Sequence, residues 1–260
     1  MKQILKIISI FILASCQTLG FNQEDPNGPV KLDLNYESFM SESWLNKAET
    51  PLINFNFFGE NIESEMFFDI NGTTIFSVND NQLSLINYDS GEVQKSYELE
   101  TSRIISGVSV GYNTFLYTDA DGVIYAHESG SGDLKWTKAL EDVVLSEILI
   151  TSTNVYVQTS SDVLYGLNLQ NGETQWSKKA QAPLLSIRGT ASPVAFEGLI
   201  FTSFSNGRLA AVREVDGIQL WEKPISRLKG STELEKLMDA DSKAVPINED
   251  VFVANYNGSL

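Results

Sequence analysis

Hydrophobic and polar residues alternate along this chain over short runs rather than with a helical period. The runs are rich in β-branched and aromatic residues, and Gly, Asn, Asp and Ser bound them. This length and composition are typical of β-strands. The pattern therefore predicts an all-β protein with strands at Met66–Ile70, Thr74–Val78, Gln82–Ile86, Thr114–Tyr117, Val123–Ala126, Asn154–Val157 and Leu199–Thr202.

A repeated phrase organises these strands: a glycine followed four residues later by a tryptophan, at a spacing of about 40 residues. Such a period is typical of a radial β array, in which one four-stranded sheet recurs. A tryptophan at the end of the last strand can bury a large area and wedge one sheet against the next. The repeat predicts a β-propeller of four-stranded blades, with structural residues at Gly132, Trp136, Gly172, Trp176, Gly217 and Trp221 and a degenerate unit at Gly91–Lys95.

A turn signal precedes the closing glycine in each unit. Asp121-Gly122 and Asn206-Gly207 are the clearest examples, and the other two units have Asp162 and Asn81 at this place. Asp-Gly and Asn-Gly favour two-residue hairpin turns, in which both central residues take a positive φ. Beyond the turn, a small residue recurs where neighbouring sheets would crowd, at Ala126, Gly166 and Ala211.

The 260 residues hold about four complete units and a partial fifth, whereas propellers close with 4–8 blades. The last unit, Val251–Leu260, stops inside a strand with no further Gly-x-x-x-Trp. A truncated C-terminus explains this better than a five-bladed ring, although residues 44–58 could supply a missing outer strand. We therefore expect a partial propeller and an incomplete ring, whose open edge would favour aggregation.

The N-terminus has the layout of a lipoprotein signal peptide. Lys2 and Lys6 precede or border an apolar run, Ile7–Leu13, that is too short to span a bilayer. The only cysteine, Cys16, follows Leu-Ala-Ser, which resembles the bacterial lipobox, where the thiol is acylated. An ordinary signal peptide with an incidental cysteine is the alternative. We expect a signal peptide at 1–15, a lipidated flexible tether at 16–43 and the propeller domain at 44–260.

The formal net charge of −16 disfavours binding to nucleic acid, because that needs clustered Lys and Arg. Solubility is the simplest consequence of the acidity, and an acidic docking face is the alternative. One cysteine also excludes an intramolecular disulfide.

Catalytic chemistry has few candidates. The single histidine, His127, occupies the strand position that Ile86, Leu167 and Val212 hold in the other units. A packed strand residue is therefore favoured over a catalytic base, and a Ser-His-Asp or Cys-His arrangement would need this one histidine. We expect no catalytic residue.

Two acidic groups are candidates for metal binding. Asp119-Ala-Asp121-Gly122 resembles a calcium loop, but a hairpin turn between two strands explains it more simply. Asp239 and Asp241 could form a metal pair, but no third carboxylate or histidine is spaced to join them. We expect neither a metal site nor a cofactor.

Two segments break the repeat and indicate where function lies. They are Leu184–Pro193 and Arg227–Asp241, each placed between a closing tryptophan strand and the next unit. Binding residues commonly lie on long loops of a rigid scaffold.

The first of these segments has the composition of a protein-binding hot spot. Leu185 and Ile187 stand beside Arg188, and arginine with buried apolar anchors dominates such surfaces. Alternatively, the apolar pair packs beneath the loop while Arg188 pairs with an acidic residue such as Asp239 or Asp241. The residues leave both interpretations open.

Together with the lipobox and the tryptophan units, these segments resemble the BamB family of outer-membrane assembly lipoproteins, within the quinoprotein-like propeller superfamily. The resemblance extends from about residue 40 to the end of the chain. Its specific stretches are Leu185–Gly189, Asn206–Leu209 and Gly230–Glu235 through Asp239–Asp241. Lys95, in place of the first tryptophan, departs from the pattern.

The resemblance implies an eight-bladed, non-catalytic propeller, of which this chain would cover about five blades. It implies a lipid anchor that holds the protein at the periplasmic face of the outer membrane. It further implies docking to the POTRA region of BamA, contact with other subunits of the BAM complex, and assistance to unfolded outer-membrane β-barrel proteins. The family's docking residues carry over to Leu185, Ile187, Arg188, Asp239 and Asp241.

Two other functions compete with this one. A fragment of a quinone-dependent dehydrogenase, of the pyrroloquinoline-quinone type, would share the tryptophan-closed blades, but would be expected to have a vicinal cysteine pair. A generic propeller scaffold with an unrelated partner is the third.

Overall fold

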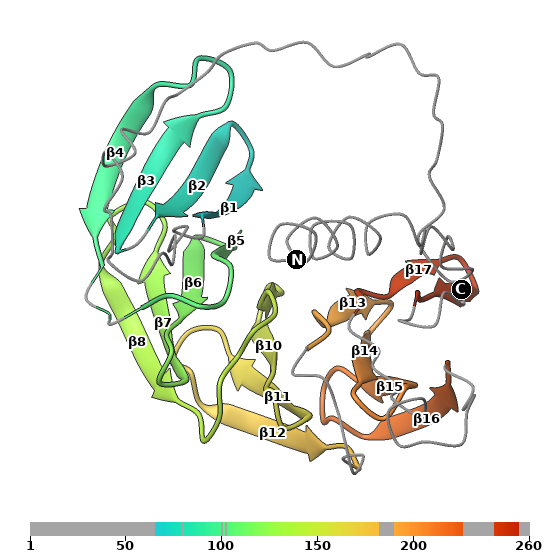
Figure 1. The fold of residues 1–260 in the computed structure, drawn as a ribbon. Helices are drawn as coiled ribbons and strands as arrows, with labels where there is room; N and C mark the ends of the chain where they lie inside the picture. The colour runs from blue at the N-terminus through green and yellow to red at the C-terminus, as the bar shows by residue number, and fades with distance from the viewer. Residues whose placement is uncertain are drawn as a thin grey trace, which may run out of the picture. The chain divides into compact units, whose positions relative to one another are not determined.

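The computed structural model describes residues 66–79, 81–99, 101, 103–181, 190–225 and 242–254, all within one compact unit. In these ranges the chain forms four antiparallel sheets of four strands and one two-stranded sheet, which we call blades 1 to 5 in chain order (Figure 1). The all-β class and the four-stranded blades predicted from sequence are confirmed. All seven predicted strands fall on observed ones.

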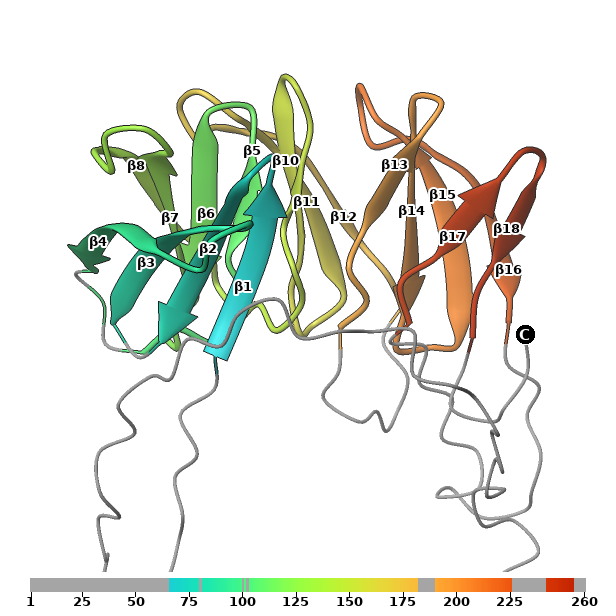
Figure 2. The same ribbon diagram turned by 90° about the horizontal axis from the view of Figure 1, so that it is seen from above.

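Within each blade, strands that follow one another in the chain lie side by side (Figures 1 and 2). Blade 1 consists of β1 (Met66–Asn71), β2 (Thr74–Asn79), β3 (Gln82–Asn87) and β4 (Val93–Glu98). Blade 2 consists of β5 (Ser109–Gly111), β6 (Thr114–Thr118), β7 (Val123–Glu128) and β8 (Leu134–Ala139). Blade 3 consists of β9 (Leu149–Ile150), β10 (Asn154–Gln158), β11 (Val163–Asn168) and β12 (Thr174–Lys179). Blade 4 consists of β13 (Val194–Phe196), β14 (Leu199–Phe204), β15 (Arg208–Arg213) and β16 (Gln219–Pro224), and blade 5 of β17 (Val245–Ile247) and β18 (Asp250–Phe252).

The hydrophobic core lies between the blades. One buried cluster joins blade 1 to blade 2, and equivalent clusters join each later blade to the next. Each fully buried large side chain contributes about 1.5–3 kcal/mol by leaving water. Stability is therefore distributed over the seams between neighbouring blades, as in other repeat proteins.

The turn between the second and third strands differs in detail from the predicted two-residue hairpin. In blade 2, Gly122 N donates to Asp119 O at 3.1 Å and Asp119 N donates to Val123 O at 3.1 Å. Only Gly122 takes a positive φ there, of 77°. This is a turn followed by a left-handed residue, the three-residue hairpin with a bulge, so a single residue needs the left-handed conformation. Gly207 and Asp162 take that role in blades 4 and 3.

The repeated glycine closes the turn between the third and fourth strands. Gly172 N donates to Asn168 O at 2.9 Å, and Gly217 N donates to Arg213 O at 2.9 Å. Both glycines have a positive φ, of 70° and 68°, which a side chain would strain. Gly91 and Gly132 close the equivalent turns with φ values of 70° and 84°.

The repeated tryptophan seals the seam to the next blade. The Trp136 indole Nε1 donates to Leu169 O at 2.9 Å, and its ring lies against Gly172. Trp176 does the same one blade later, with Nε1 3.1 Å from Glu214 O and its ring against Gly217. The turn glycine is thus required twice, for its left-handed φ and for the space the indole occupies.

The small residue predicted where sheets crowd also has a physical reason. Gly166 pairs with Trp176 across the β11–β12 ladder, and a Cβ at Gly166 would lie 2.5 Å from Trp176 Cε2. Ala126 and Ala211 oppose Trp136 and Trp221 in the same register. A β-bulge follows this pair in blades 2, 3 and 4, where it turns the outer strand and aims the indole, and the same bulge follows the pair of Leu85 and Lys95 in blade 1.

Candidate functional site

The predicted lipidation residue Cys16 and the predicted partner-binding residues Leu185, Ile187, Arg188, Asp239 and Asp241 lie outside the described residues. What the structure does describe is the chain on either side of the two segments that carry the partner-binding residues. Gln181 and Thr190 are the described residues on either side of 182–189, and Ile225 and Ser242 are those on either side of 226–241.

Both segments leave the sheets at the same end of blades 3 and 4. Ala180 N donates to Asp162 O at 2.9 Å, and Ile225 N donates to Gly207 O at 3.0 Å. These bonds hold the ends of β12 and β16 beside the β10–β11 turn (159–162) and the β14–β15 turn (204–207). We call this end, with Gln181 and Ile225, the turn end.

A buried carboxylate joins the two turns. Asp162, only 2% exposed, accepts a hydrogen bond from Ser205 N at 3.1 Å and another from the Ser205 hydroxyl. Charge-assisted bonds of this kind are about twice as strong as neutral ones. The turn end of blade 3 is therefore fixed to that of blade 4.

A second carboxylate holds the β10–β11 turn from the preceding connection. Asp142 accepts from the Ser160 hydroxyl at 2.9 Å and from Ser161 N at 2.6 Å. Burial acts to raise the pKa of Asp142, but the bonds from Ser161 and Ser160 outweigh it and hold the pKa below its ordinary value. The carboxylate is thus a charged acceptor that rigidifies the turn.

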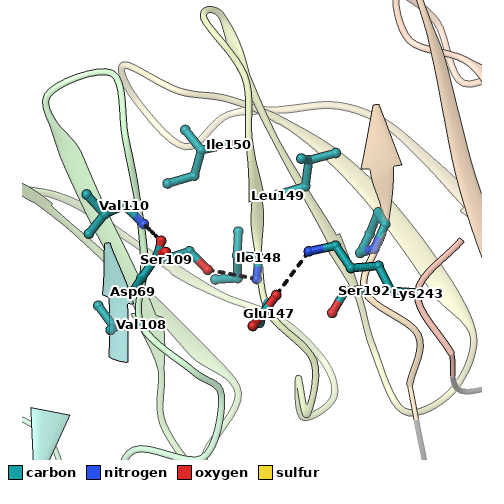
Figure 3. Close-up of a pocket in the computed structure, with 11 residues that line it drawn as sticks. Asp69, Val108, Ser109, Val110, Glu147, Ile148, Leu149, Ile150, Ser192 and Lys243 are labelled. Carbon is teal, nitrogen blue, oxygen red and sulfur yellow. Dashed lines mark hydrogen bonds and ion pairs between the residues drawn. The ribbon is translucent and has the colours of Figure 1, made fainter. Parts of the chain in front are cut away.

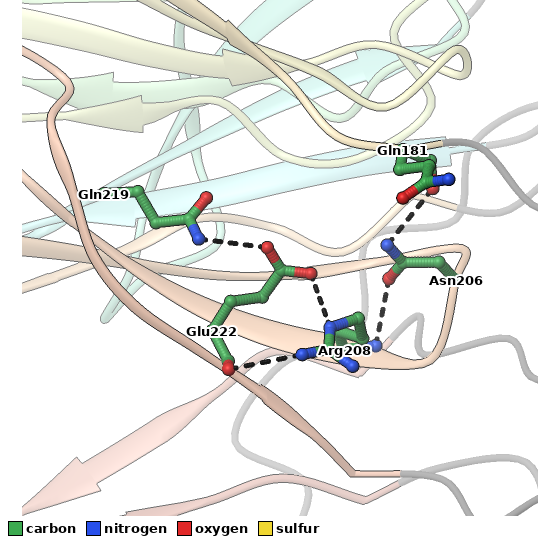
Figure 4. Close-up of polar contacts among 5 residues, drawn as sticks. All are labelled: Gln181, Asn206, Arg208, Gln219 and Glu222. Carbon is green, nitrogen blue, oxygen red and sulfur yellow. Dashed lines mark hydrogen bonds and ion pairs between the residues drawn. The ribbon is translucent and has the colours of Figure 1, made fainter.

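A polar network extends this end along blade 4 (Figure 4). Asn206 Nδ2 donates to Gln181 O at 3.1 Å, while Arg208 N donates to Asn206 Oδ1 at 3.1 Å. Arg208 Nε lies 2.6 Å from Glu222 Oε1, and Gln219 Nε2 donates to Glu222 Oε2 at 3.1 Å. The network fixes the point where the chain enters the first segment.

The sequence marks Asn206–Leu209 by its Asn-Gly turn signal and by its resemblance, but does not predict the Arg208–Glu222 ion pair. Arg208 pairs with Pro224 across the β15–β16 ladder, two positions from Glu222, so the strand register could have found it. The pair is partly exposed and contributes at most about 1 kcal/mol to stability. Its effect is on the orientation of the guanidinium.

The inner strands of blades 1 to 3 border a cavity of about 210 Å³ (Figure 3). Asp69 Oδ2 accepts from Val110 N at 2.7 Å, and Ser109 Oγ accepts from Ile148 N at 3.1 Å, so side chains tie each inner strand to the next. Glu147 pairs with Lys243 at 3.2 Å across the cavity, and both are exposed. These contacts use the polar groups of the cavity to join blades.

His127 is a packed residue of β7. Its ring stacks on Phe115 with centroids 4.9 Å apart, and Nδ1 lies 3.0 Å from Gly132 O. A carbonyl only accepts, so Nδ1 carries the proton and Nε2 accepts from the Tyr117 hydroxyl at 3.2 Å. Burial lowers the pKa of His127 below its ordinary value. This is the environment of a neutral structural histidine.

The lowered pKa of His127 predicts a pH effect on stability. The unfolded chain takes up a proton near pH 6.5, before the folded chain does, so the histidine's contribution to the free energy of unfolding falls as the pH drops below about 6.5. Urea unfolding of the protein and of His127→Leu, between pH 7.5 and pH 5, measures this. Leucine occupies the equivalent position 167. The variant should show a flatter pH slope, and equal slopes would contradict the assignment.

The segment Asp119–Gly122, predicted to be a hairpin turn and not a calcium loop, forms a turn between β6 and β7. Asp119, 3% exposed, accepts from Asp121 N at 3.0 Å, Val123 N at 2.9 Å and the Tyr125 hydroxyl at 2.9 Å. Burial, then the bond to Asp119, raises the pKa of Tyr125. Across the described ranges, no three His, Cys, Asp or Glu side chains converge to hold a metal ion. In the same ranges no helix has the length and apolar character needed to cross a bilayer.

Comparison with known proteins identifies one family. The family model for the outer membrane protein assembly factor BamB matches residues 69–260. The BamB of Yersinia pestis is 29% identical over 160 residues, which cover 61% of this chain and 41% of that protein. The BamB of Vibrio cholerae is 34% identical over 122 residues, covering 47% of this chain and 32% of that protein. The chain thus matches less than half the length of these relatives.

Solved structures share the fold. The crystal structure of BamB from Moraxella catarrhalis superposes with a TM-score of 0.67 at 23% identity, over 74% of this chain and 58% of that one. The computationally designed Ika8 protein superposes with a TM-score of 0.60 at 12% identity, over 74% of this chain and 55% of that one. At these identities the likeness concerns architecture alone.

Proposed function

Because the chain belongs to the BamB family of outer membrane protein assembly factors, we propose that it is a non-catalytic scaffold of the β-barrel assembly machinery. The observation that carries the proposal is the family match over residues 69–260. In the blades, the indoles of Trp136 and Trp176 and the carboxylate of Asp162 join neighbouring sheets. In this role the protein assists the folding and insertion of outer-membrane β-barrel proteins.

The proposed partner is the POTRA region of BamA, and the proposed contact residues are Leu185, Ile187, Arg188, Asp239 and Asp241. The geometry of the turn end supports the choice of these residues. The segments that carry them begin beside two turns joined by Asp162 and Ser205, on blades whose cores are continuous. Two loops held at one rigid end can present a single surface, which lowers the entropic cost of binding.

The proposed location is the periplasmic face of the outer membrane. Acylation of Cys16 would anchor the protein there, since two or more acyl chains hold a protein stably at a membrane. Residues 17–43 would then act as the tether between the lipid and the propeller. Labelling with radioactive palmitate in cells, with Cys16→Ser as the control, tests this anchor.

Charge reversal at Arg188 is expected to weaken binding to the POTRA region of BamA at least about tenfold, because truncation of a hot-spot arginine costs about 2 kcal/mol or more. The measurement is a titration of the whole chain with that region, by fluorescence or calorimetry. Lys179→Glu is the matched control, since Lys179 is exposed on β12 and the change in net charge is the same.

Three outcomes of this titration are informative. Loss of binding in Arg188→Glu but not in Lys179→Glu supports a specific contact. Equal loss in both variants would show that overall charge matters, and not this residue. No binding by the folded parent would overturn the scaffold proposal. The alternative, a quinone-dependent dehydrogenase fragment, predicts instead that pyrroloquinoline quinone with calcium binds and changes the absorbance of the chain.

A further inference from the structure

The seam between blades 1 and 2 is built from different residues than the later seams. Four and six positions after the turn glycine, blade 2 has Trp136 and Lys138, and blade 3 has Trp176 and Lys178. Blade 1 has Lys95 and Tyr97 at these positions. The aromatic residue and the lysine have exchanged places.

In blade 1, two side chains together make the kinds of contact that one tryptophan makes in blades 2 and 3. The Tyr97 ring takes the place of the indole against the next turn glycine, Gly132. The Lys95 ammonium takes the place of the indole N–H and donates to Gly130 O at 3.2 Å and Ser131 O at 3.3 Å. It also lies 4.6 Å from the Tyr97 ring centroid, a cation–π contact. The Tyr97 hydroxyl donates to Gly130 O at 3.3 Å.

The Lys95–Tyr97 pair is more open to water than the tryptophans of blades 2 and 3. Trp136 and Trp176 are 8% and 9% exposed, whereas Tyr97 is half-buried and Lys95 is exposed. An exposed ammonium gains little from carbonyl contacts because water competes for it. A smaller ring also removes less apolar area from water. Strand β3 shows the same change, since Leu85 opposes Lys95 where the later blades have Ala or Gly opposite Trp.

We propose that the seam between blades 1 and 2 is the joint of the blade array, at which blade 1 separates from blade 2 as a unit while the seams between blades 2, 3 and 4 stay closed. Separation breaks the contacts of Lys95 and Tyr97 and uncovers the cluster between the blades. The apolar surface that becomes accessible includes Phe76, Leu83, Phe115 and Tyr117. The joint is a property of the fold and does not depend on the proposed function.

A second cause could also loosen blade 1. The face of β1 that carries Phe68 and Ile70 is 63% and 46% exposed at those residues. A blade with one uncovered face frays more readily, whatever holds its other face. The two causes differ in one respect, since only the joint responds to changes at Lys95 and Tyr97.

Hydrogen exchange of the whole chain, followed by mass spectrometry under native conditions, tests the joint. We expect amides of β2 and β3 to exchange faster than those of β10 and β11. Lys95→Met, which keeps the stem and removes the ammonium, should speed exchange in blade 1 by at most about fivefold, because the contact is exposed to water, and should leave blades 3 and 4 unchanged.

A second variant converts the seam to the form found in blade 2. Leu85→Ala, Lys95→Trp and Tyr97→Lys together should slow exchange in blade 1 about tenfold, which corresponds to 1.4 kcal/mol. If blade 1 of the parent protein exchanged as slowly as blade 3 of the same protein, the proposal would be overturned. Unchanged exchange in the triple variant would also overturn it, because fraying of the uncovered face would then be sufficient.

Discussion

Replacement of Trp176 by alanine is expected to lower the free energy of unfolding by about 3–5 kcal/mol, the usual cost of removing a buried tryptophan. The indole is 9% exposed and lies against Gly217. It also packs on Tyr156, with ring centroids 5.7 Å apart. The substitution therefore opens a cavity in the seam between blades 3 and 4 and removes the donor to Glu214 O.

The effect should be visible in thermal and urea unfolding. For a domain of this size each kcal/mol lowers the melting temperature by about 2–4 °C. A repeat array need not unfold in one step, so the two probes should be compared before one free energy is assigned. A loss below about 1 kcal/mol would mean that the tryptophan does not seal the seam.

Trp176→Phe is the matched control for the two parts of this contact. Phenylalanine keeps a ring against Gly217 but has no N–H. The Glu214 carbonyl retains one donor, since the Tyr156 hydroxyl lies 3.3 Å from it. We therefore expect Trp176→Phe to lower the free energy of unfolding by about 1–2 kcal/mol, which is less than the loss in Trp176→Ala. Equal losses in Phe and Ala variants would assign the whole effect to the indole N–H.

Local signals in the sequence were sufficient to predict the blades. Alternation located strands such as β2 and β14, and the Gly-x-x-x-Trp phrase located the turns and the outer strands. These features depend on residues close in sequence, where strand period and turn geometry act directly. The predicted type of the turn before β7 was wrong, because Asp-Gly also fits a turn in which only Gly122 is left-handed.

The contacts between blades could not be predicted from one sequence. Asp162 and Ser205 are 43 residues apart, and nothing local marks the aspartate as their link. Lys95 was visible as a departure from the repeat, but its replacement by the Lys95–Tyr97 pair depends on the turn of the next blade. The predicted docking residues, from Leu185 to Asp241, stay predictions because they lie outside the described residues.

Gly217→Ala is expected to cost about 2–5 kcal/mol, because two penalties meet at this residue. The φ of 68° is left-handed, which costs an alanine about 1–2 kcal/mol. The added Cβ would also lie 2.5 Å from Trp176 Cε3, and crowding of a packed contact costs about 1–3 kcal/mol. Urea unfolding of the variant and the parent measures the sum.

A second glycine of the same blade separates the two penalties. Gly198 has a φ of 77°, yet an added Cβ there meets nothing within 4 Å. Gly198→Ala should therefore show the conformational cost alone, about 1–2 kcal/mol. The excess in Gly217→Ala is then the crowding against the indole. Equal costs at both positions would mean that the indole moves aside freely.

A double-mutant cycle between positions 176 and 217 measures whether the indole and the added Cβ are energetically coupled. If the indole causes the excess, Gly217→Ala in the Trp176→Ala background should cost no more than Gly198→Ala does in the parent. Residues in direct contact commonly show coupling of about 0.5–3 kcal/mol, whereas distant ones add within about 0.5 kcal/mol. Coupling in that range would make each turn glycine and the tryptophan of the preceding blade one unit, so a blade that loses either residue loses its seam. Additive costs would instead leave the glycine as a turn residue only, and the seam would depend on the tryptophan alone.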